Sequence, residues 1–496
     1  MFDIYEKCIS GRYDVDDNVL EGLQIRLSEL QREIKAAGIP VMIVFDGWSA
    51  SGKGTMISRL LRSLDPRGFK VYSITEPTET EKRYHEMHRY WVKIPSAGNI
   101  AIFDRSWYGN LEFKEGKPHK AKNQQKIFDI IDFESQLSAE GYLIIKFFLH
   151  ISESEQKKRF DKLKSVKSTE WRVGKSDIKQ NENYNKVYHT LCDIFDKTDI
   201  VCAPWHIVDA KEKDCAAACV YSTVIECMER ALEHKSRGLE INPILPDISS
   251  PSQPLPSQKL GEIDLSVNLG EVSYKKRLKE CQARLFELQN ELYRRRIPLI
   301  IAYEGWDAAG KGGNIKRITQ ALDPRGYEVI PIASPTPEEK SRHFLWRFWR
   351  AMPKDGHTAI FDRTWYGRVL VERIEGFATD AEWKRAYDEI NRFEDSLVNS
   401  GAIVVKFWLH IDKDEQLARF NDRQNTPSKQ WKITDEDWRN RAKWDEYEKA
   451  VDEAIALTNT ANAPWIIIES NDKKYARIRA LEEIIALVEK RLAERL

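Results

Sequence analysis

The sequence predicts an α/β protein made of two tandem domains, each a mainly parallel sheet flanked by helices, with a phosphate-binding loop (P-loop) in each. Three observations predict this fold class. The chain has 496 residues, which suits two domains of ordinary size better than one core. A short apolar run that begins at Ile300 ends in a glycine-rich turn that closes on Lys311. The same succession of motifs occurs twice, 258 to 260 residues apart.

Charge and composition limit the classes of function. Lysine plus arginine and aspartate plus glutamate are both 78, so the chain has no net charge to attract a polyanion. A phosphate-rich ligand must therefore be held by a local basic cleft, and no nucleic-acid partner is expected. No apolar run reaches the roughly eighteen residues of a membrane span, and the first residues lack a secretory pattern. Seven cysteines, an odd number, favour reduced thiols. We expect a cytoplasmic protein with no membrane partner.

The first repeat opens with a helix that leads into a strand and a loop. Apolar residues at three- and four-residue spacing predict an amphipathic helix over 17–37. The apolar run 41–45 predicts a strand. Asp-Gly-Trp-Ser-Ala-Ser-Gly-Lys-Gly-Thr at 46–55 follows it and predicts the first phosphate-binding loop.

Three further pairs of motifs establish the duplication. Leu-Asp-Pro-Arg-Gly begins at 64 and again at 322, and Ala-Ile-Phe-Asp-Arg-(Ser/Thr)-Trp-Tyr-Gly begins at 101 and again at 359. Ala-Pro-Trp begins at 203 and 463, so two residues were gained or lost between the second and third pairs. Chance similarity between two loops would not keep such an offset.

A segment rich in proline and serine, 236–268, predicts an extended linker between the repeats. The predicted domains are therefore 1–235 and 269–496. In the second domain an amphipathic helix is predicted over 274–295. Its strands are predicted at 298–304, 328–333, 358–362, 402–409 and 464–469. This alternation of strands and helices predicts a sheet covered on both faces.

The second loop has the spacing of a phosphate cradle. Gly305 and Gly310 bracket four residues, which lets backbone N–H groups and the start of the next helix converge on one anion. Lys311 adds a positive charge at that phosphate. Gly312 stands where a serine or threonine would normally contact Mg²⁺, so Asp307 inside the loop is the predicted metal anchor. The alternative is a glycine-rich helix start with a solvated aspartate.

The third strand of each repeat ends in Asp-Arg, and these residues are Asp362 and Arg363 in the second repeat. An acidic residue at the carboxyl end of a strand beside the loop strand is placed to contact a metal ion. The adjacent arginine can reach a transferring phosphoryl group. The alternative is an aspartate that caps the following turn, but a cap alone would not require the repeated Arg-Thr-Trp-Tyr-Gly.

Basic residues between the fourth strand and the last helices predict a mobile lid at 419–441. Closing such side chains over phosphates would exclude water and neutralise negative charge. A second stretch of basic and aromatic residues, 341–350, predicts either one wall of a polyanion channel or an amphipathic core helix. The basic residues of the lid include Arg419, Arg423, Lys429, Lys432 and Arg439.

Together these motifs resemble the family-2 polyphosphate kinases over nearly the whole chain, twice. The resemblance rests on Gly-x-Asp-Ala-Ala-Gly-Lys-Gly-Gly, Leu-Asp-Pro-Arg-Gly, Phe-Asp-Arg-Thr-Trp-Tyr-Gly-Arg, Pro-x-Lys-x-Trp-Lys and Ala-Pro-Trp. The two-copy layout is similar to that of the polyphosphate:AMP phosphotransferases. It implies a thymidylate-kinase-like P-loop fold. It also implies a kinase that moves a phosphoryl group from inorganic polyphosphate to AMP, with ADP as product and Mg²⁺ as cofactor.

The resemblance also assigns site residues in the second repeat. Asp307 and Asp362 would hold the metal and orient the acceptor phosphate, and Lys311 and Arg363 would contact phosphates. Arg423 would complete the catalytic set from the lid. The phosphate- or nucleotide-binding residues would be Gly305, Gly310, Gly312, Gly313, Arg368, Glu372, Arg419 and Lys432.

Three alternatives to this function stay open from the sequence. The first is another enzyme of the family that phosphorylates ADP to ATP. The second is an ATP-dependent nucleotide kinase of the same fold. The third is a polyphosphate-binding protein without activity. A homo-oligomer is compatible with each of them.

The two repeats differ at the predicted site. The first repeat keeps Lys53, Asp104 and Arg105, but it loses one loop carboxylate and two arginines. We therefore predict that only the second repeat turns over. The first would serve as a scaffold, as a subunit-like partner or as an extra phosphate-binding surface. The substitutions, second repeat to first, are Asp307 to Ser49, Arg423 to Leu163 and Arg477 to Ala217.

Overall fold

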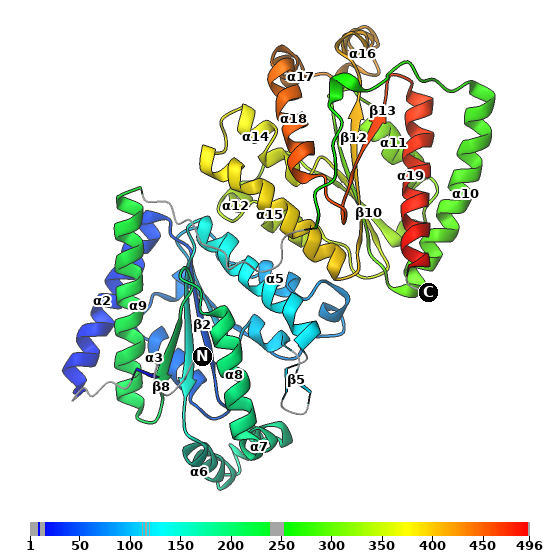
Figure 1. Cartoon of the computed structure of the whole chain (residues 1–496). Helices are drawn as coiled ribbons and strands as arrows, with labels where there is room; N and C mark the ends of the chain where they lie inside the picture. The colour runs from blue at the N-terminus through cyan, green and yellow to red at the C-terminus, as the bar shows by residue number, and fades with distance from the viewer. Residues whose placement is uncertain are drawn as a thin grey trace. The chain divides into compact units, whose positions relative to one another are not determined.

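Two parallel sheets organise the computed structural model, which describes residues 8–9, 15–111, 113–114, 117–118, 120–238 and 252–494 (Figure 1). Each sheet belongs to one of two compact units. Unit 1 comprises Met1–Thr78, Arg89–Ile248 and Pro337–His343, and unit 2 comprises Glu79–His88, Ser249–Thr336 and Phe344–Leu496. The predicted domain boundaries stay predictions.

The sheet of unit 1 has the strand order β1-β8-β7-β2-β4-β3, with all neighbours parallel. In Figure 1, α2 and α9 lie side by side on one face and α5 and α8 cover the other. A separate antiparallel pair joins β5 and β6. The strands are β1 (Cys8–Ile9), β2 (Val41–Gly47), β3 (Phe69–Ser73), β4 (Ile100–Asp104), β5 (Phe113–Lys114), β6 (Lys117–Pro118), β7 (Leu143–His150) and β8 (Trp205–Asp209). The helices are α2 (Asp17–Ala37), α3 (Lys53–Leu61), α5 (Lys120–Ala139), α6 (Glu153–Lys164), α7 (Lys175–Glu182), α8 (Tyr184–Thr198) and α9 (Lys213–Ser236), with the short helices α4 (His88–Trp91) and α12 (Pro337–Lys340).

The sheet of unit 2 has the strand order β10-β11-β9-β12-β13 and is parallel throughout. The helices α10 and α19 lie side by side on one face, and α15 and α18 cover the other (Figure 1). The strands are β9 (Leu299–Gly305), β10 (Tyr327–Pro331), β11 (Thr358–Asp362), β12 (Ile403–His410) and β13 (Trp465–Glu469). The helices are α10 (Glu271–Arg295), α11 (Lys311–Thr319), α13 (Trp346–Ala351), α14 (Val371–Ile374), α15 (Asp380–Asn399), α16 (Lys413–Asn425), α17 (Asp435–Ala442), α18 (Trp444–Thr458) and α19 (Lys473–Ala493).

The predicted α/β class is confirmed, and so are the elements on which it depended. The five strands of unit 2 begin and end within two residues of their predicted bounds. The opening helix coincides with α2, because Asp16 caps its start by accepting the N–H of Val19 and Gly38 ends it in the left-handed conformation. The central strands β9 and β12 are almost wholly buried, as expected for parallel strands covered on both faces.

The second half of the predicted linker packs on unit 2. The N–H of Ser252 donates to Oδ2 of Asp395 at 2.8 Å, and the N–H of Leu255 donates to the carbonyl oxygen of Asn459 at 2.7 Å. Leu260 is 1% exposed. The stretch 252–260, predicted as part of an extended linker, is therefore bound to unit 2. The first half of the predicted linker, at 239–251, lies outside the described residues.

The basic and aromatic stretch 341–350 contributes to the core. Trp346, Phe348 and Trp349 of α13 are each 3% exposed. This burial supports the amphipathic core helix rather than a channel wall. Among the described residues, no helix is long and apolar enough to cross a membrane.

Candidate active site

The loop of the second repeat adopts a backbone that only particular residues allow. β9 ends at Gly305, where a Cβ atom would lie 2.6 Å from the carbonyl oxygen of Leu409 on the neighbouring strand. Gly310 has a φ of 111°, in the region that favours glycine. Ala308 has a φ of 63°, a costly conformation for alanine that is often found at functional sites. The two glycines therefore enclose a tight turn that ends at the start of α11.

Lys311 is the first residue of α11 and folds back over this turn. Its Nζ atom donates to the carbonyl oxygens of Gly305 at 2.6 Å and of Trp306 at 3.2 Å. The ammonium group is thereby held beside the start of the helix, where backbone N–H groups attract an anion. Its predicted contact with a phosphate stays a prediction.

The end of β11 brings Asp362 and Arg363 to the same edge of the sheet. Asp362 pairs in register with Tyr303 of β9, because the two parallel strands are neighbours. Arg363 has a φ of 67°, which is unusual for a residue with a side chain. Its Nη2 atom lies 3.5 Å from Oδ1 of Asp307. The loop and the end of β11 therefore place acidic and basic side chains next to each other.

Asp307 is held between the loop and the lid rather than free in solvent. Its Oδ2 atom accepts a hydrogen bond of 2.9 Å from the side-chain amide of Asn440 on α17. Its carbonyl oxygen accepts from Nε2 of Gln416 on α16 at 3.1 Å. Asn440 and Arg363 therefore orient the carboxylate, while Gln416 fixes the backbone of the same residue. This geometry argues against a merely solvated aspartate.

A cavity of about 880 Å³ opens over the loop. Its walls are more positive than negative, which suits a polyanion even though the whole chain is neutral. The eight basic residues are Lys311, Arg363, Arg419, Arg423, Lys429, Lys432, Lys473 and Arg477. The five acidic residues are Asp307, Asp362, Asp422, Glu436 and Asp437.

Most of the predicted site residues line this cavity. Gly305 lines a smaller cavity next to it instead. Those that line the large cavity are Asp307, Gly310, Lys311, Gly312, Gly313, Asp362, Arg363, Arg419, Arg423 and Lys432.

Arg368 and Glu372 line neither cavity. Nε of Arg368 lies 3.3 Å from Oε2 of Glu372, and its guanidinium lies 4.7 Å from the ring centre of Phe344. In this conformation the two charged groups face each other. Their assigned contacts with a nucleotide stay predictions.

Arg419 uses all five of its N–H donors to hold the protein together. It is 5% exposed. Four donors reach backbone carbonyl oxygens of the loop and of the turn after β13, so the guanidinium links these two segments and stabilises the loop. Its assigned contact with a phosphate stays a prediction. The acceptors are Glu415 Oε1 and the carbonyl oxygens of Ala308, Ala309, Ser470 and Asn471, at 2.5 to 3.0 Å.

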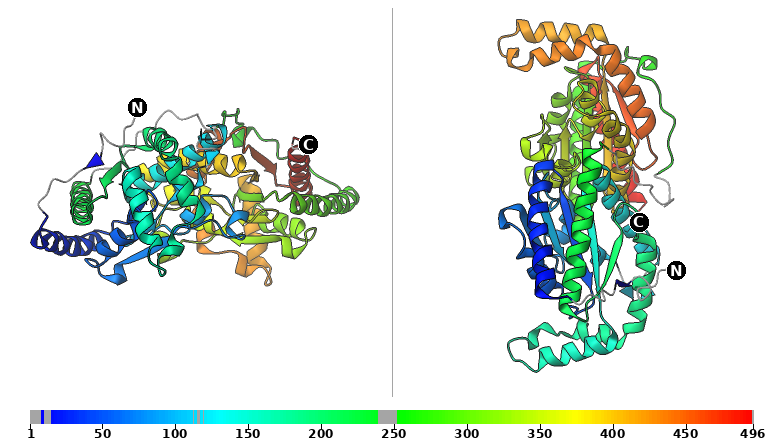
Figure 2. Two further views of the ribbon diagram at one scale, coloured as in Figure 1. Left: turned by 90° about the horizontal axis from the view of Figure 1, so that it is seen from below. Right: turned by 90° about the vertical axis from the view of Figure 1, so that its left-hand side faces the viewer.

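The lid comprises α16, α17 and the turn between them. Figure 2 shows α16 and α17 projecting from the sheet of unit 2. Nη1 of Arg423 donates to the carbonyl oxygen of Lys432 at 2.9 Å, which ties the two ends of the turn together. Trp431 on this turn is 76% exposed. The lid thus carries both basic residues and an exposed aromatic ring beside the cavity.

Several residues that line the cavity were not predicted as site residues. Lys473 begins α19 directly after β13, at the carboxyl end of a strand, where sheets of this kind place groups that bind ligands. That position could have identified it. Arg477 lies one turn later, and the sequence comparison used it only as a difference between the repeats. Asp437 was missed because its side chain also caps Thr434 at the start of α17.

The smaller cavity, of about 90 Å³, has aromatic walls. The rings of Trp306 and Trp444 stack with their centres 3.7 Å apart. Glu304, also in the wall, accepts from the N–H and the hydroxyl of Thr364, both at 2.7 Å. Burial raises the pKa of Glu304. This apolar pocket with one buried carboxyl group adjoins Lys311.

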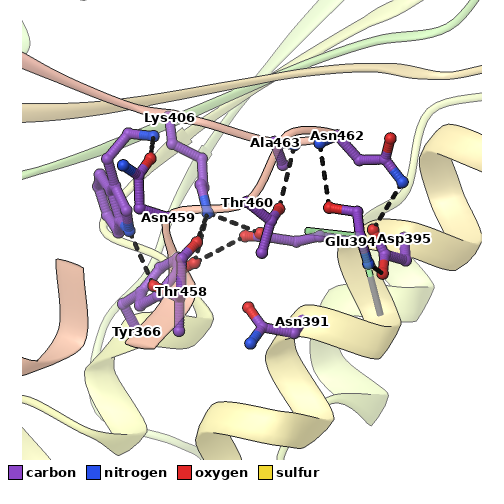
Figure 3. A network of polar contacts seen from close by, with 12 residues as sticks. Tyr366, Asn391, Glu394, Asp395, Lys406, Thr458, Asn459, Thr460, Asn462 and Ala463 are labelled. Carbon is purple, nitrogen blue, oxygen red and sulfur yellow. Dashed lines mark hydrogen bonds and ion pairs between the residues drawn. The ribbon is translucent and has the colours of Figure 1, made fainter. Parts of the chain in front are cut away.

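A buried polar network anchors the turn behind Asp362 and Arg363 (Figure 3). Nζ of Lys406 donates to Oε2 of Glu394 at 2.7 Å, to the hydroxyl of Tyr366 and to the carbonyl oxygen of Thr458. Oε1 of Glu394 accepts from the hydroxyl of Tyr366 and from the indole N–H of Trp365. Burial of this ion pair is tolerable because each of its members has hydrogen-bond partners. Unit 1 has the same network, so it belongs to the scaffold. Its members there are Lys146, Glu134, Tyr108, Thr198 and Trp107.

The loop of the first repeat keeps its shape but loses a carboxylate. Ser49 stands at the position of Asp307, and its hydroxyl donates to Oδ1 of Asp177 on α7 at 2.6 Å. The N–H of Ser49 donates to Oε1 of Gln180 at 3.0 Å. Gln180 occupies the position of Asn440 in the repeat. The lid helix therefore contacts the loop in both units, but through the backbone N–H and hydroxyl of Ser49 in one and the carboxylate of Asp307 in the other.

Comparisons with known proteins agree with this geometry. The family model described as polyphosphate kinase 2 matches residues 12–236 and again 268–495. A polyphosphate:AMP phosphotransferase of Pseudomonas aeruginosa is 40% identical over 99% of both chains. One of Pseudomonas syringae is 38% identical over 97% of this chain and 96% of its own. A crystal structure of a polyphosphate kinase 2 from Pseudomonas aeruginosa superposes with a TM-score of 0.85 at 38% identity, covering 99% of both chains.

Proposed function

The chain belongs to the polyphosphate kinase 2 family, and we propose that it transfers a phosphoryl group from inorganic polyphosphate to AMP, giving ADP. The observation that carries the proposal is the cavity with eight basic side chains over the loop of the second repeat. Two anionic substrates can meet there only if their charges are neutralised. Relatives with the same two-repeat layout, matched over nearly their full length, carry this activity in their names.

The reaction needs alignment and charge neutralisation more than covalent help from side chains. An oxygen of the AMP phosphate attacks the terminal phosphorus of polyphosphate, and the P–O–P bond to the next phosphate breaks. The shortened chain leaves with the bonding electron pair. Lys311 and Arg363 stabilise the negative charge on the transferring group from two sides. Arg423 and Lys432 add charge from the lid, which also excludes water that would hydrolyse polyphosphate.

We propose Mg²⁺ as the cofactor, held by Asp307 and Asp362. Both are carboxylates that line the cavity beside Lys311, and oxygen ligands suit a hard divalent cation. No group of three or more histidine, cysteine or acidic residues close enough to hold a metal is found among the described residues. Phosphate oxygens and water would therefore complete the shell, as is usual for Mg²⁺. When bound, the ion would supply positive charge that neutralises the phosphates.

Phosphorylation of ADP to ATP is the second candidate. An ADP-polyphosphate phosphotransferase of Rhizobium meliloti is 40% identical, but it matches only 47% of this chain. That relative covers the length of about one repeat. The two-repeat layout therefore favours AMP as acceptor.

The experiment that tests the proposal supplies polyphosphate and Mg²⁺ with either AMP or ADP and separates the nucleotides by chromatography. We expect ADP from AMP. ATP from ADP, with no product from AMP, would support the second candidate instead. A parallel reaction with ATP in place of polyphosphate tests the donor. If AMP is converted to ADP as fast with ATP as with polyphosphate, the proposal is contradicted.

We also propose that the protein acts in the cytoplasm as a homo-oligomer. The odd number of cysteines supports a reducing compartment. Cys202, Cys219, Cys227 and Cys281 are free thiols. Analytical ultracentrifugation tests the oligomeric state, and a single species with the mass of one chain at micromolar concentration would contradict it.

A further inference from the structure

The first repeat keeps a phosphate-binding loop that the proposed reaction does not use. This loop joins β2 to α3 and has the backbone shape of the catalytic loop. The unusual φ angles agree position by position. They are 150° at Gly47, 60° at Ala50 and 101° at Gly52, against 143° at Gly305, 63° at Ala308 and 111° at Gly310. A strained loop of this kind is retained where the surrounding structure or a ligand requires it.

Lys53 holds the place of Lys311 with the same contacts. Its Nζ atom donates to the carbonyl oxygens of Gly47 and Trp48, both at 3.0 Å. Both acceptors are uncharged. Burial lowers the pKa of Lys53, so a bound anion would offset the cost of burying its charge. Arg105, at a φ of 66°, matches Arg363.

The changes between the repeats remove carboxylates more than cations. Ser49, Lys162 and Ser176 of the first repeat occupy the positions of Asp307, Asp422 and Glu436. At the positions that line the catalytic cavity, basic residues therefore outnumber acidic ones by four in the first repeat and by three in the second. The first repeat has six basic residues at the positions that line the catalytic cavity, Lys53, Arg105, Arg159, Lys162, Arg172 and Lys213, and two acidic residues, Asp104 and Asp177.

One polar side chain in the first loop lacks a partner. Ser51 is 3% exposed, and its hydroxyl makes no hydrogen bond. It occupies the position of Ala309, which lines the cavity of the second repeat. A buried hydroxyl without a partner is costly, and an oxygen of a phosphate in this loop would satisfy it.

We propose that the loop of the first repeat binds a segment of inorganic polyphosphate without a metal ion and without transferring a phosphoryl group. Its cations suffice to hold a polyanion. It lacks the loop carboxylate that would anchor a metal, because Ser49 offers a hydroxyl that is already bonded to Asp177. The choice of polyphosphate rests on the proposed function, whereas the anion site rests on the loop itself.

The test counts bound tripolyphosphate on the full chain by isothermal titration calorimetry, with EDTA present and no acceptor. We expect one equivalent that resists EDTA. Lys53→Ala should weaken it at least about tenfold, since a hydrogen bond to a charged group is lost, whereas Lys53→Arg should preserve it. Lys311→Ala, the matched change in the second repeat, should alter it less than about twofold.

Three results would overturn the proposal. The first is that no tripolyphosphate binds in the presence of EDTA. The second is that Lys311→Ala removes the EDTA-resistant binding. The third is that Lys53→Ala leaves this binding unchanged in a protein with a normal unfolding temperature. Displacement of tripolyphosphate by an equal concentration of AMP would also overturn it, because the site would then bind nucleotides. Since no acceptor is needed, a chain that binds tripolyphosphate here but fails to phosphorylate AMP would contradict only the proposed function.

Discussion

The side-chain amide of Asn440, on the lid helix α17, donates a 2.9 Å hydrogen bond to Oδ2 of Asp307 in the phosphate-binding loop. The two residues are 133 positions apart. The hydroxyl of Tyr447 lies 3.4 Å from Oδ1 of Asn440 and extends the contact into α18. The lid therefore orients the carboxylate that we propose as a metal ligand.

We predict that Asn440→Ala weakens binding of the divalent ion about ten- to a hundredfold, as loss of a group that orients a ligand commonly does. Titration with Mn²⁺ followed by electron paramagnetic resonance measures this without turnover. The matched change Gln180→Ala in the first repeat should leave the affinity unchanged. Equal Mn²⁺ affinity in Asn440→Ala and the unaltered chain would show that the contact does not position Asp307.

Lys311→Ala and Asp362→Asn should each lower kcat for AMP phosphorylation at least roughly a hundredfold, because each removes a charge directed at the transferring group. The fold should stay intact, since neither side chain belongs to the buried network around Glu394. Steady-state rates together with circular dichroism provide the measurement. Near-normal kcat in either folded variant would remove that residue from the site.

Binding of polyphosphate should weaken steeply with salt although the chain is neutral. A polyanion held by several basic side chains releases counterions, by analogy with nucleic acid, so the affinity should fall markedly between about 50 and 200 mM salt. Fluorescence titration with a labelled polyphosphate at several salt concentrations tests this. A constant affinity would argue against the basic cavity.

Acid should destabilise the protein through its buried histidines. Trp306 donates to Nδ1 of His410 at 3.0 Å, and burial lowers the pKa of His410 from 6.5 to about 4. Between these values the unfolded chain binds a proton that the folded chain does not, so stability rises with pH and is lost as pH falls from about 6.5 to 4. Unfolding temperatures measured across this range should show a shallower decline in His410→Asn.

An exposed histidine provides the control for this prediction. His234→Asn on α9 should leave the decline with pH as steep as in the unaltered chain. If His410→Asn and His234→Asn behave alike, the acid sensitivity arises elsewhere.

Much of the fold and the centre of the site could be predicted from the sequence, because they depend on local patterns. Buried parallel strands are continuous apolar runs, and Gly310 and Lys311 follow one of them at fixed spacing. The arrangement around Asp307 could not be predicted. Asn440 and Gln416 reach it only after the lid folds back over the sheet.

Other contacts could not be predicted for the same physical reason. The assignment of Arg419 to phosphate stays a prediction, but its contacts with the carbonyl oxygens of Ser470 and Asn471 form only because the fold brings the turn after β13 to its guanidinium. The proline-rich stretch at 252–260 was predicted as part of an extended linker. Its backbone groups instead find partners such as Asp395 and Asn459, which no local pattern reveals.

We predict that the second repeat alone carries the chemistry. The most direct measurement compares initial rates of ADP formation from AMP, polyphosphate and Mg²⁺ for Asp307→Ser and for Lys53→Ala. Asp307→Ser should lose about a thousandfold or more, and adding Ser49→Asp should not restore activity. Lys53→Ala should keep most of the rate. A well-folded Lys53→Ala protein that is inactive would show that both repeats contribute chemistry, and would contradict this division.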